Sequence, residues 1–477
     1  MQISFQSSLL LALTAIPLTD VTSAEKILGA YIFARHGDRT PKVLGNTQLT
    51  DLGYSEVYQA GSYYHSRYIN STSSQHIEGI SDTVVNLKQI TATVPSDTVL
   101  QNSGIGFLQG LYPPVGKAAN QTLANRTTIE TPLDGYQLIP LNLISNGRHS
   151  EDDSWLQDST DCLNAKVSSN NYYISPLYNN LLHSTNDFYN TLSDALNGTF
   201  TESNISFRSA YTIFDYFNFA KIHNTTDILT NDQLHRLFLL ANIEQYNLAY
   251  NSSDTVRAIA GSQLAGEILE ALNETITSQG QKKLNIQFGS YGTFLSYFGL
   301  AELPTANVNF TGIPDYASSM AWELVTNSTT DRFPDASEIN VRFIFHNGTA
   351  TGSGHPREYP LYGQTSNTIP WSMFAAETKK IAVISNEEWC KACGNSDGKC
   401  ASVSSSNSGS GYAGSGSKSN GGMSRPVAGV IGAMVALVVI FGLEALFLLL
   451  GGFRITKKCN AHAEGHTSVV TETKSTA

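Results

Sequence analysis

The pattern of apolar positions first predicts a strand over residues 27–35. The run is rich in aromatic and β-branched residues, as buried strands are. It stops at a cluster of two arginines and one histidine. The cluster also contains a glycine and a proline, which are typical of loops. The pattern therefore places Arg35, His36 and Arg39 at the carboxyl end of a strand.

Helical periodicity follows this strand. An apolar stripe predicts a helix that Thr50 or Asp51 caps. The stripe consists of Val57, Ala60, Gly61, Tyr64 and Tyr68. A helical stretch within residues 85–115 closes at the proline pair 113–114, and a helix over residues 234–250 has Asn231 or Asp232 as its candidate cap.

A second strand, loop and helix unit occupies residues 284–300. Residues 284–288 alternate as a half-buried strand does, a Gly-containing loop follows, and a helix runs over 293–300. A helix after Asp254 precedes this unit, with Gly261, Leu264, Ala265, Ile268 and Leu272 on one face. The order of elements predicts an open α/β sheet whose ligand lies beyond the strand ends.

The last third of this region returns to strand patterning. Residues 339–345 alternate up to the turn at Asn347. A helix over 371–377 and a closing strand over 381–385 are expected next. His346 and His355 fall at or after the alternating strand, and we interpret both as surface histidines.

The cluster after the first strand has the chemistry of a phosphate pocket. The planar fork of an arginine matches the oxygens of a phosphate. An imidazole between two guanidiniums is pushed towards its neutral form, which can attack phosphorus. We therefore expect His36 to be a nucleophile and Arg35 and Arg39 to hold the phosphate.

These residues also resemble a known family. Residues 35–41 read Arg35-His36-Gly37-Asp38-Arg39-Thr40-Pro41, which is similar to the R-H-G-x-R-x-P signature of the histidine acid phosphatases, the branch with acid phosphatases and phytases. Residues 49–53 resemble the family's L-T-x-x-G helix start. The resemblance extends over roughly residues 27–395.

The resemblance implies a fold and an activity. The fold would be a phosphoglycerate mutase-like, three-layer α/β structure with an open sheet, flanking helices and an inserted, mostly helical lobe at roughly 115–250. The activity would be hydrolysis of phosphomonoesters through a phosphohistidine. No metal or organic cofactor is expected, because the arginines supply the positive charge.

The chain departs from the family at two positions. The family's second motif is a His-Asp pair, and Ser290 and Tyr291 stand there in this chain. Serine can donate a hydrogen bond to phosphate, whereas tyrosine is a weak proton donor. A further phosphate-binding arginine of the family aligns with Thr98 or Val99.

These departures leave alternatives open. Arg148 can compensate for the missing arginine or be a solvated loop residue, and Asp38 can be structural or reach the leaving group. The leading hypothesis is a phosphatase. The second is a cell-surface module that binds phosphoesters without turnover, and the third is a structural surface glycoprotein.

Composition bears on partners and location. The 477 residues carry a net charge of -11, which gives no support to nucleic-acid binding. Residues 1–24 resemble a secretory signal, and residues 25–400 then form the ectodomain. Eleven Asn-x-Ser/Thr sequons predict N-linked glycans, at Asn70, Asn120, Asn125, Asn197, Asn204, Asn224, Asn251, Asn273, Asn309, Asn327 and Asn347.

The C-terminal composition predicts a membrane anchor. Residues 401–426 are rich in Ser and Gly and indicate a flexible stalk. Residues 427–453 are almost wholly apolar and long enough to form a single transmembrane helix. Arg454, Lys457 and Lys458 follow, so residues 454–477 are expected in the cytosol. The chain would be a single-pass type I protein of the cell surface or of a secretory-pathway membrane.

Four cysteines fall in the predicted ectodomain. Cys162, Cys390, Cys393 and Cys400 are even in number, which suits two disulfides in an oxidising compartment. No second CxxC or nearby histidine completes a zinc site around residues 390–393. All three pairings remain open.

Overall fold

The computed structural model describes residues 25–144, 161–225, 229–349 and 356–401. The predicted signal, stalk, transmembrane helix and cytosolic tail lie outside these residues, as do Arg148 and His355. Within the described ranges, every helix is too short or too polar to span a membrane.

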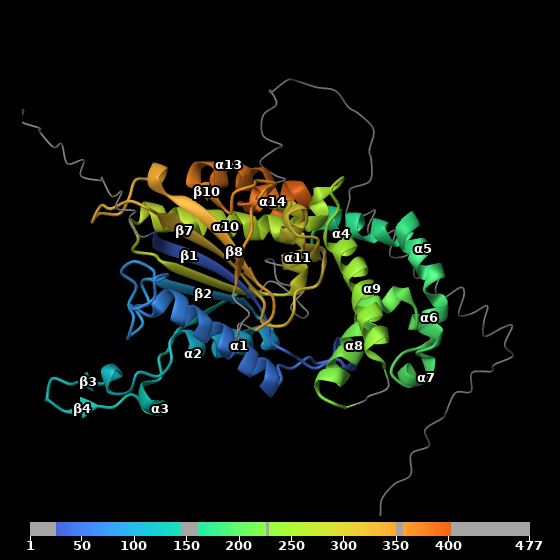
Figure 1. Cartoon of the computed structure of the whole chain (residues 1–477), viewed down its shortest axis with the longest axis horizontal. Coiled ribbons are helices and arrows are strands. Elements are labelled where there is room, and N and C mark those ends of the chain that lie inside the picture. Colours follow the sequence, from blue (N-terminus) through green and yellow to red (C-terminus); the bar gives the residue numbers. More distant parts are fainter. Residues whose placement is uncertain (1–24, 145–160, 226–228, 350–355, 402–477) are drawn as a thin grey trace, which may run out of the picture. The chain divides into compact units, whose positions relative to one another are not determined.

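The described residues form an α/β fold around one mixed sheet (Figure 1). The strand order is β10-β8-β7-β1-β6-β2-β5, with β9 paired to β8. The parallel strands are β1 (Lys26–Arg35), β6 (Leu284–Gly289), β2 (Ile90–Pro95) and β5 (Leu141–Ile144). The antiparallel strands are β7 (Ser319–Thr326), β8 (Asn340–His346), β9 (Arg357–Glu358) and β10 (Thr368–Pro370).

Helices cover both faces of the sheet. Helices α1 (Asp51–Tyr64) and α2 (Thr98–Leu111) lie on one face, and α10 (Ile259–Thr277), α11 (Tyr291–Leu300) and α13 (Trp371–Ile381) lie on the other (Figure 1). A hydrophobic core lies on each face of the sheet, and strand β1 contributes side chains to both, because its side chains alternate between the faces. Ala30 and Ile32 pack towards α1 and α2, and Tyr31 and Phe33 pack towards α10 and α11.

The register of the sheet sets the position of the two predicted loops. Strands β1 and β6 are parallel neighbours, with Arg35 opposite Gly289. Both strands therefore end at the same edge, and His36 and Ser290 follow directly. The expectation that ligand-binding residues gather beyond these strand ends is consistent with this topology.

Most predicted elements are confirmed, with four corrections. The cap of α9 (Asn231–Ala249) is Thr230, in a capping box with Gln233, and neither Asn231 nor Asp232. Strand β6 is largely buried on both faces rather than half-buried, because Leu284, Ile286 and Phe288 pack in the core with α1 and α2 and Gln287 bonds to Glu267 of α10 on the other face. Residues 382–385 form no strand; the N–H of Val383 instead donates to the carbonyl of Ser262 on α10, at 2.9 Å. His346 is buried rather than superficial, and its Nδ1 bonds to the carbonyl of Gly348 at 2.7 Å.

A separate helical core lies between β5 and α10 in the sequence. Its helices are α4 (Leu163–Asn170), α5 (Pro176–Ser184), α6 (Asn186–Asn190), α7 (Ser193–Leu196), α8 (Ala210–Ile222) and α9. The preceding described residues, 115–144, hold the short hairpin β3 (Gln121–Thr122) and β4 (Thr128–Ile129), the short α3 (Pro132–Gly135) and β5. Helices α8 and α9 pack together, and α9 also contacts α11.

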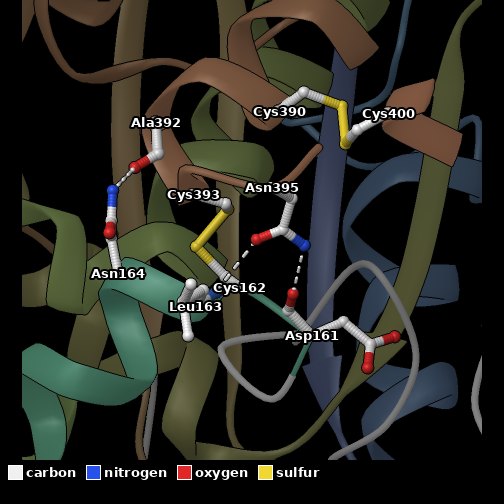
Figure 2. Close-up of a disulfide and its surroundings, with 9 residues drawn as sticks. All are labelled: Asp161, Cys162, Leu163, Asn164, Cys390, Ala392, Cys393, Asn395 and Cys400. Atoms are coloured by element: carbon white, nitrogen blue, oxygen red, sulfur yellow. Dashed lines mark hydrogen bonds between the residues drawn. A yellow bond between two sulfur atoms is a disulfide. The ribbon is translucent and has the colours of Figure 1, made fainter. Parts of the chain in front are cut away.

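Two disulfides form at the end of the fold, as the even cysteine count predicts, and one of them joins it to this lobe. Cys162 pairs with Cys393 and Cys390 pairs with Cys400 (Figure 2). The first bond links the start of α4 to α14 (Asn386–Cys393). Asn395 reinforces the link, because its Nδ2 donates to the carbonyl of Asp161 at 2.6 Å and its Oδ1 accepts from the N–H of Leu163 at 3.2 Å.

Candidate active site at the end of β1

The loop after β1 is held by the first turn of α1. A Cβ at Gly37 would lie 2.2 Å from the carbonyl oxygen of Gly53, so both glycines are needed for this approach. Thr50 caps α1 and its Oγ1 donates to Oδ2 of Asp38 at 2.5 Å. The N–H of Asp38 donates to Oε2 of Glu56 at 2.8 Å. The two sequence motifs therefore form one structural unit.

His36 is held as a neutral imidazole. Its side chain is fully buried, and Nδ1 bonds to the carbonyl of Gly37 at 2.8 Å. Because a carbonyl only accepts, Nδ1 carries the proton and Nε2 has the lone pair. Burial first, and then Arg35 and Arg39, lower the pKa of His36 well below its usual value. Nε2 has no hydrogen-bond partner among the described residues.

Arg35 contacts the segment 313–316 and α11. Its guanidinium donates to the carbonyl of Pro314. The guanidinium carbon lies 4.4 Å from the ring centroid of Tyr316 and 5.3 Å from that of Tyr291. The Tyr316 ring also packs against His36, with centroids 5.5 Å apart. Tyr316 thus touches both the imidazole and one of the two arginines.

Arg39 forms a buried ion pair with the helical lobe. Its Nη1 lies 3.0 Å from Oδ2 of Asp215 on α8, and Nη2 donates to the hydroxyl of Tyr211 at 3.0 Å. Both side chains of the pair are almost fully buried. Oδ2 of Asp215 also accepts from the N–H of Lys42 at 2.9 Å. An incoming phosphate would therefore share Arg39 with a carboxylate.

The second motif lies at the start of α11. Ser290 precedes the helix and is buried, as is Tyr291. The Tyr291 hydroxyl donates to Oε1 of Gln245 on α9 at 2.9 Å, and its ring packs on Tyr211 with centroids 4.8 Å apart. The tyrosine ring, rather than its hydroxyl, faces Arg35.

Other carboxyl groups surround the motif. Oδ2 of Asp38 is bound by Thr50 and, at 2.7 Å, by Nε2 of His223, which supports the structural interpretation of Asp38. Burial raises the pKa of Glu56 to about 7. Burial also raises the pKa of Asp315, although Arg35 opposes this effect. Sequence reasoning missed Asp215, Asp315 and Tyr316, since no motif accompanies them.

The position of the family's additional arginine is occupied differently. Helix α2 begins at Thr98 and contacts the motif through Ser103, whose Oγ accepts from the N–H of Gly37 at 3.3 Å. No group of three or more His, Cys, Asp or Glu within the described ranges is arranged to hold a metal ion.

A cleft of about 340 Å³ opens beside Arg35. Asp215, Asp315 and Tyr316 line it, together with side chains of α8 and α9. His36 does not line this cleft, but Tyr316 lines it and packs on His36. The cleft shares five residues with a larger groove of about 1280 Å³.

This fold and these motifs define a histidine phosphatase. The model of the histidine phosphatase superfamily, branch 2, matches residues 42–346, which is more than half of the 477 residues, and the chain belongs to this family. The match begins one residue after the motif at 35–41. No curated protein sequence matches the chain.

Solved structures of the same family resemble the chain at low identity. The Hafnia alvei phytase in complex with tartrate has 13% identity and a TM-score of 0.51 over 78% of this chain and 98% of its own. The Klebsiella sp. ASR1 phytase has 11% identity and a TM-score of 0.50 over 76% of this chain and 95% of its own. Likeness at this level concerns the fold.

Proposed function

We propose that the chain hydrolyses phosphomonoesters through a phosphohistidine at His36. The observation that carries the proposal is the state of this imidazole. It is buried and neutral, with Nδ1 bound to Gly37 and the lone pair on Nε2, beside two arginines. Membership of the histidine phosphatase superfamily supports phosphatase chemistry in general.

The proposed reaction has two steps. Nε2 attacks phosphorus, the N–P bond forms, and the P–O ester bond breaks. Water then attacks the phosphohistidine, the N–P bond breaks, and inorganic phosphate leaves. Arg35, Arg39 and the Ser290 hydroxyl would stabilise the phosphoryl oxygens. To bind the phosphate, the Arg39 guanidinium would have to direct at least one of its N–H groups away from Asp215.

The proton donor that we propose is Asp315 rather than Tyr291. The hydroxyl of Tyr291 already donates a hydrogen bond to Oε1 of Gln245. Asp315 lines the cleft beside Arg35, and its raised pKa favours the protonated acid. Asp315 would protonate the leaving oxygen and recover a proton from the attacking water.

The test compares esters with good and poor leaving groups. The purified full-length chain is assayed from pH 3 to 7 with an aryl phosphate and an alkyl phosphate. His36→Ala should abolish both activities, and activity that survives in this variant contradicts the mechanism. Asp315→Asn should slow the alkyl ester about 10²- to 10⁴-fold and the aryl ester much less. Tyr291→Phe is the matched control, and an equal selective loss there would assign the acid to Tyr291.

Two observations favour a second candidate function. Arg39 is bound by a buried carboxylate, and His36 is fully covered, which suits a module that binds phosphoesters without turnover. Such a module would bind inorganic phosphate in calorimetry yet release none from an aryl phosphate. Release of phosphate that depends on His36 would exclude it.

We also propose that the enzyme is a glycosylated, single-pass membrane protein with its catalytic domain outside the cytosol. The apolar segment 427–453 supports the anchor, and the two disulfides suit an oxidising compartment. None of the eleven sequon asparagines is buried. Removal of N-glycans should lower the apparent mass, and protease should degrade the domain at the surface of intact cells or, for a lumenal domain, only after the vesicles are opened. A domain that protease degrades from the cytosolic side of sealed vesicles, with unchanged mass, contradicts the proposal.

A further inference from the structure

The groove next to the candidate site is largely apolar. It has a volume of about 1280 Å³ and runs between α9, the segment 307–315 and the end of β8. Its apolar lining includes Phe238, Leu239, Tyr246, Val308, Phe310 and Phe345. Small-molecule sites commonly have volumes of about 300–1,000 Å³ and are lined mainly by such side chains.

The groove is continuous with the cleft at Arg35. Both are lined by His235, Phe238, Ile313, Pro314 and Asp315. Pro314 is the residue whose carbonyl accepts from the Arg35 guanidinium. A phosphate held by Arg35 would therefore have its ester group directed along this shared wall.

The charges along the two cavities do not suit a polyanion. Arg35 and Arg357 are the arginines among the lining residues, and Asp215 and Asp315 are the carboxylates. Once Arg35 holds the ester phosphate, Arg357 is the one arginine left among these lining residues for any further phosphate. Several phosphates on one substrate would lack cationic partners, since each charge that leaves water needs an opposite charge or a hydrogen bond.

We propose that this groove binds the leaving group of the substrate, and that the substrate carries one phosphate on a bulky apolar group. The inference rests on the proposed function and specifies its substrate class. The phosphate would lie at Arg35, and the apolar group would cover the aromatic side chains of α9, β8 and the segment 307–315. Leu239 and Val308 are 47% and 71% exposed, so apolar surface at the groove is open to a ligand.

The first test uses alkylphosphonates of two to ten carbons, which bind without being hydrolysed. Isothermal titration calorimetry with the full-length chain should show affinity rising about fourfold for each buried methylene. myo-Inositol hexakisphosphate should bind at least about tenfold more weakly than octylphosphonate. Affinity that does not depend on chain length, or a hexakisphosphate that binds more tightly, overturns the inference.

The second test changes the groove. Leu239→Glu combined with Val308→Glu should lower the ratio of octyl- to ethylphosphonate affinity at least about tenfold. Leu138→Glu, at a leucine that is 78% exposed and lines neither cavity, is the control and should leave the ratio unchanged. All three sites are exposed, and thermal unfolding checks that the variants fold. An unchanged ratio in the double variant overturns the inference.

Two sequon asparagines, Asn309 and Asn347, also line the groove. Both tests are therefore run before and after enzymatic removal of N-glycans, and a chain-length dependence absent in both states overturns the inference. The outcomes also separate this inference from the proposed function. Turnover of an aryl phosphate by His36 without chain-length dependence rejects only the apolar leaving-group site. Absence of both turnover and phosphonate binding rejects both.

Discussion

At the scale of single residues, the chemistry of the β1 terminus could be predicted and its surroundings could not. The arginines beside His36 are its sequence neighbours, so their effect on the imidazole is visible in the motif. Burial, the larger cause of the lowered pKa, depends on the packing of distant segments. Asp215 and Tyr316 come from α8 and the segment 313–316, and no local pattern marks residues that meet only in the folded chain.

The Arg39–Asp215 pair makes a prediction about phosphate affinity. Asp215→Asn keeps an oxygen that can accept from Arg39 but removes the negative charge. A charge pair about 4 Å apart interacts by about 4 kcal/mol near a protein surface, so the loss of this repulsion should strengthen phosphate binding at least about tenfold. Calorimetric titration with inorganic phosphate at fixed ionic strength measures this change.

The control for this variant is Asp194→Asn, at an exposed aspartate in the same lobe. This change should leave phosphate affinity as it is. The Asp215 variant should also lose some stability, because a buried guanidinium loses its counter-charge. Phosphate binding that is equal or weaker in Asp215→Asn contradicts the prediction.

At the scale of elements, helices were predicted with fewer errors than strand environments and caps. The stripes of α1 and α10 show 3.6-residue periodicity, which the sequence displays directly. The sequence pattern predicts no strand at β7 and wrongly predicts one directly after α13. An extended segment becomes a strand only through its neighbours, and 382–385 lie along α10 instead of at the sheet edge. Ser290 and Tyr291 follow β6, which is the parallel neighbour of β1, so they lie at the same edge of the sheet as His36.

Small residues set the distance between α1 and α2. A Cβ at Gly61 would lie 1.9 Å from the carbonyl oxygen of Phe107, so Gly61→Ala must push backbone away from backbone. We expect the substitution to lower the free energy of unfolding by about 1–3 kcal/mol, as overpacking does. Urea denaturation followed by circular dichroism measures the loss.

Gly292→Ala is the matched control for Gly61→Ala. Its nearest contact would be Oγ of Ser290 at 3.9 Å, and it lies inside α11. Alanine there should leave the protein equally or more stable, by up to about 1 kcal/mol, because glycine is unfavourable in a helix. Equal urea midpoints for the two variants would show that the helices can separate at no cost.

At the scale of the whole molecule, buried carboxyls recur around the fold. Burial raises the pKa values of Glu56, Glu244 and Glu267 to about 7 from an ordinary 4.5. They lie on α1, α9 and α10. Buried carboxyls with raised pKa values therefore occur in the helices on both faces of the sheet and in the helical lobe. Composition gave no indication of it, since the count of acidic residues does not reveal which of them are buried.

These carboxyls predict that the fold is more stable in acid. A pKa raised on folding means that the native state binds more protons than the unfolded chain between pH 4.5 and 7. The stabilisation is complete below about pH 4.5 and is lost as pH rises through 7, on the order of 3 kcal/mol for the buried Glu244. The lowered pKa of His36 has the opposite effect on stability. As pH falls below 6.5, the unfolded chain binds a proton at this histidine before the native state does, so the native state becomes less stable.

Because these three carboxyls and Asp315 oppose one histidine, the free energy of unfolding should be higher at pH 5 than at pH 7.5. Denaturant titrations at the two pH values measure the difference. Glu244→Gln should reduce it, since glutamine keeps an acceptor for the N–H of Tyr211 but does not titrate. Glu202→Gln, at an exposed site, should leave the difference unchanged. A wild-type chain that gains stability from pH 5 to 7.5 would show that these carboxyls are ionised in the native state.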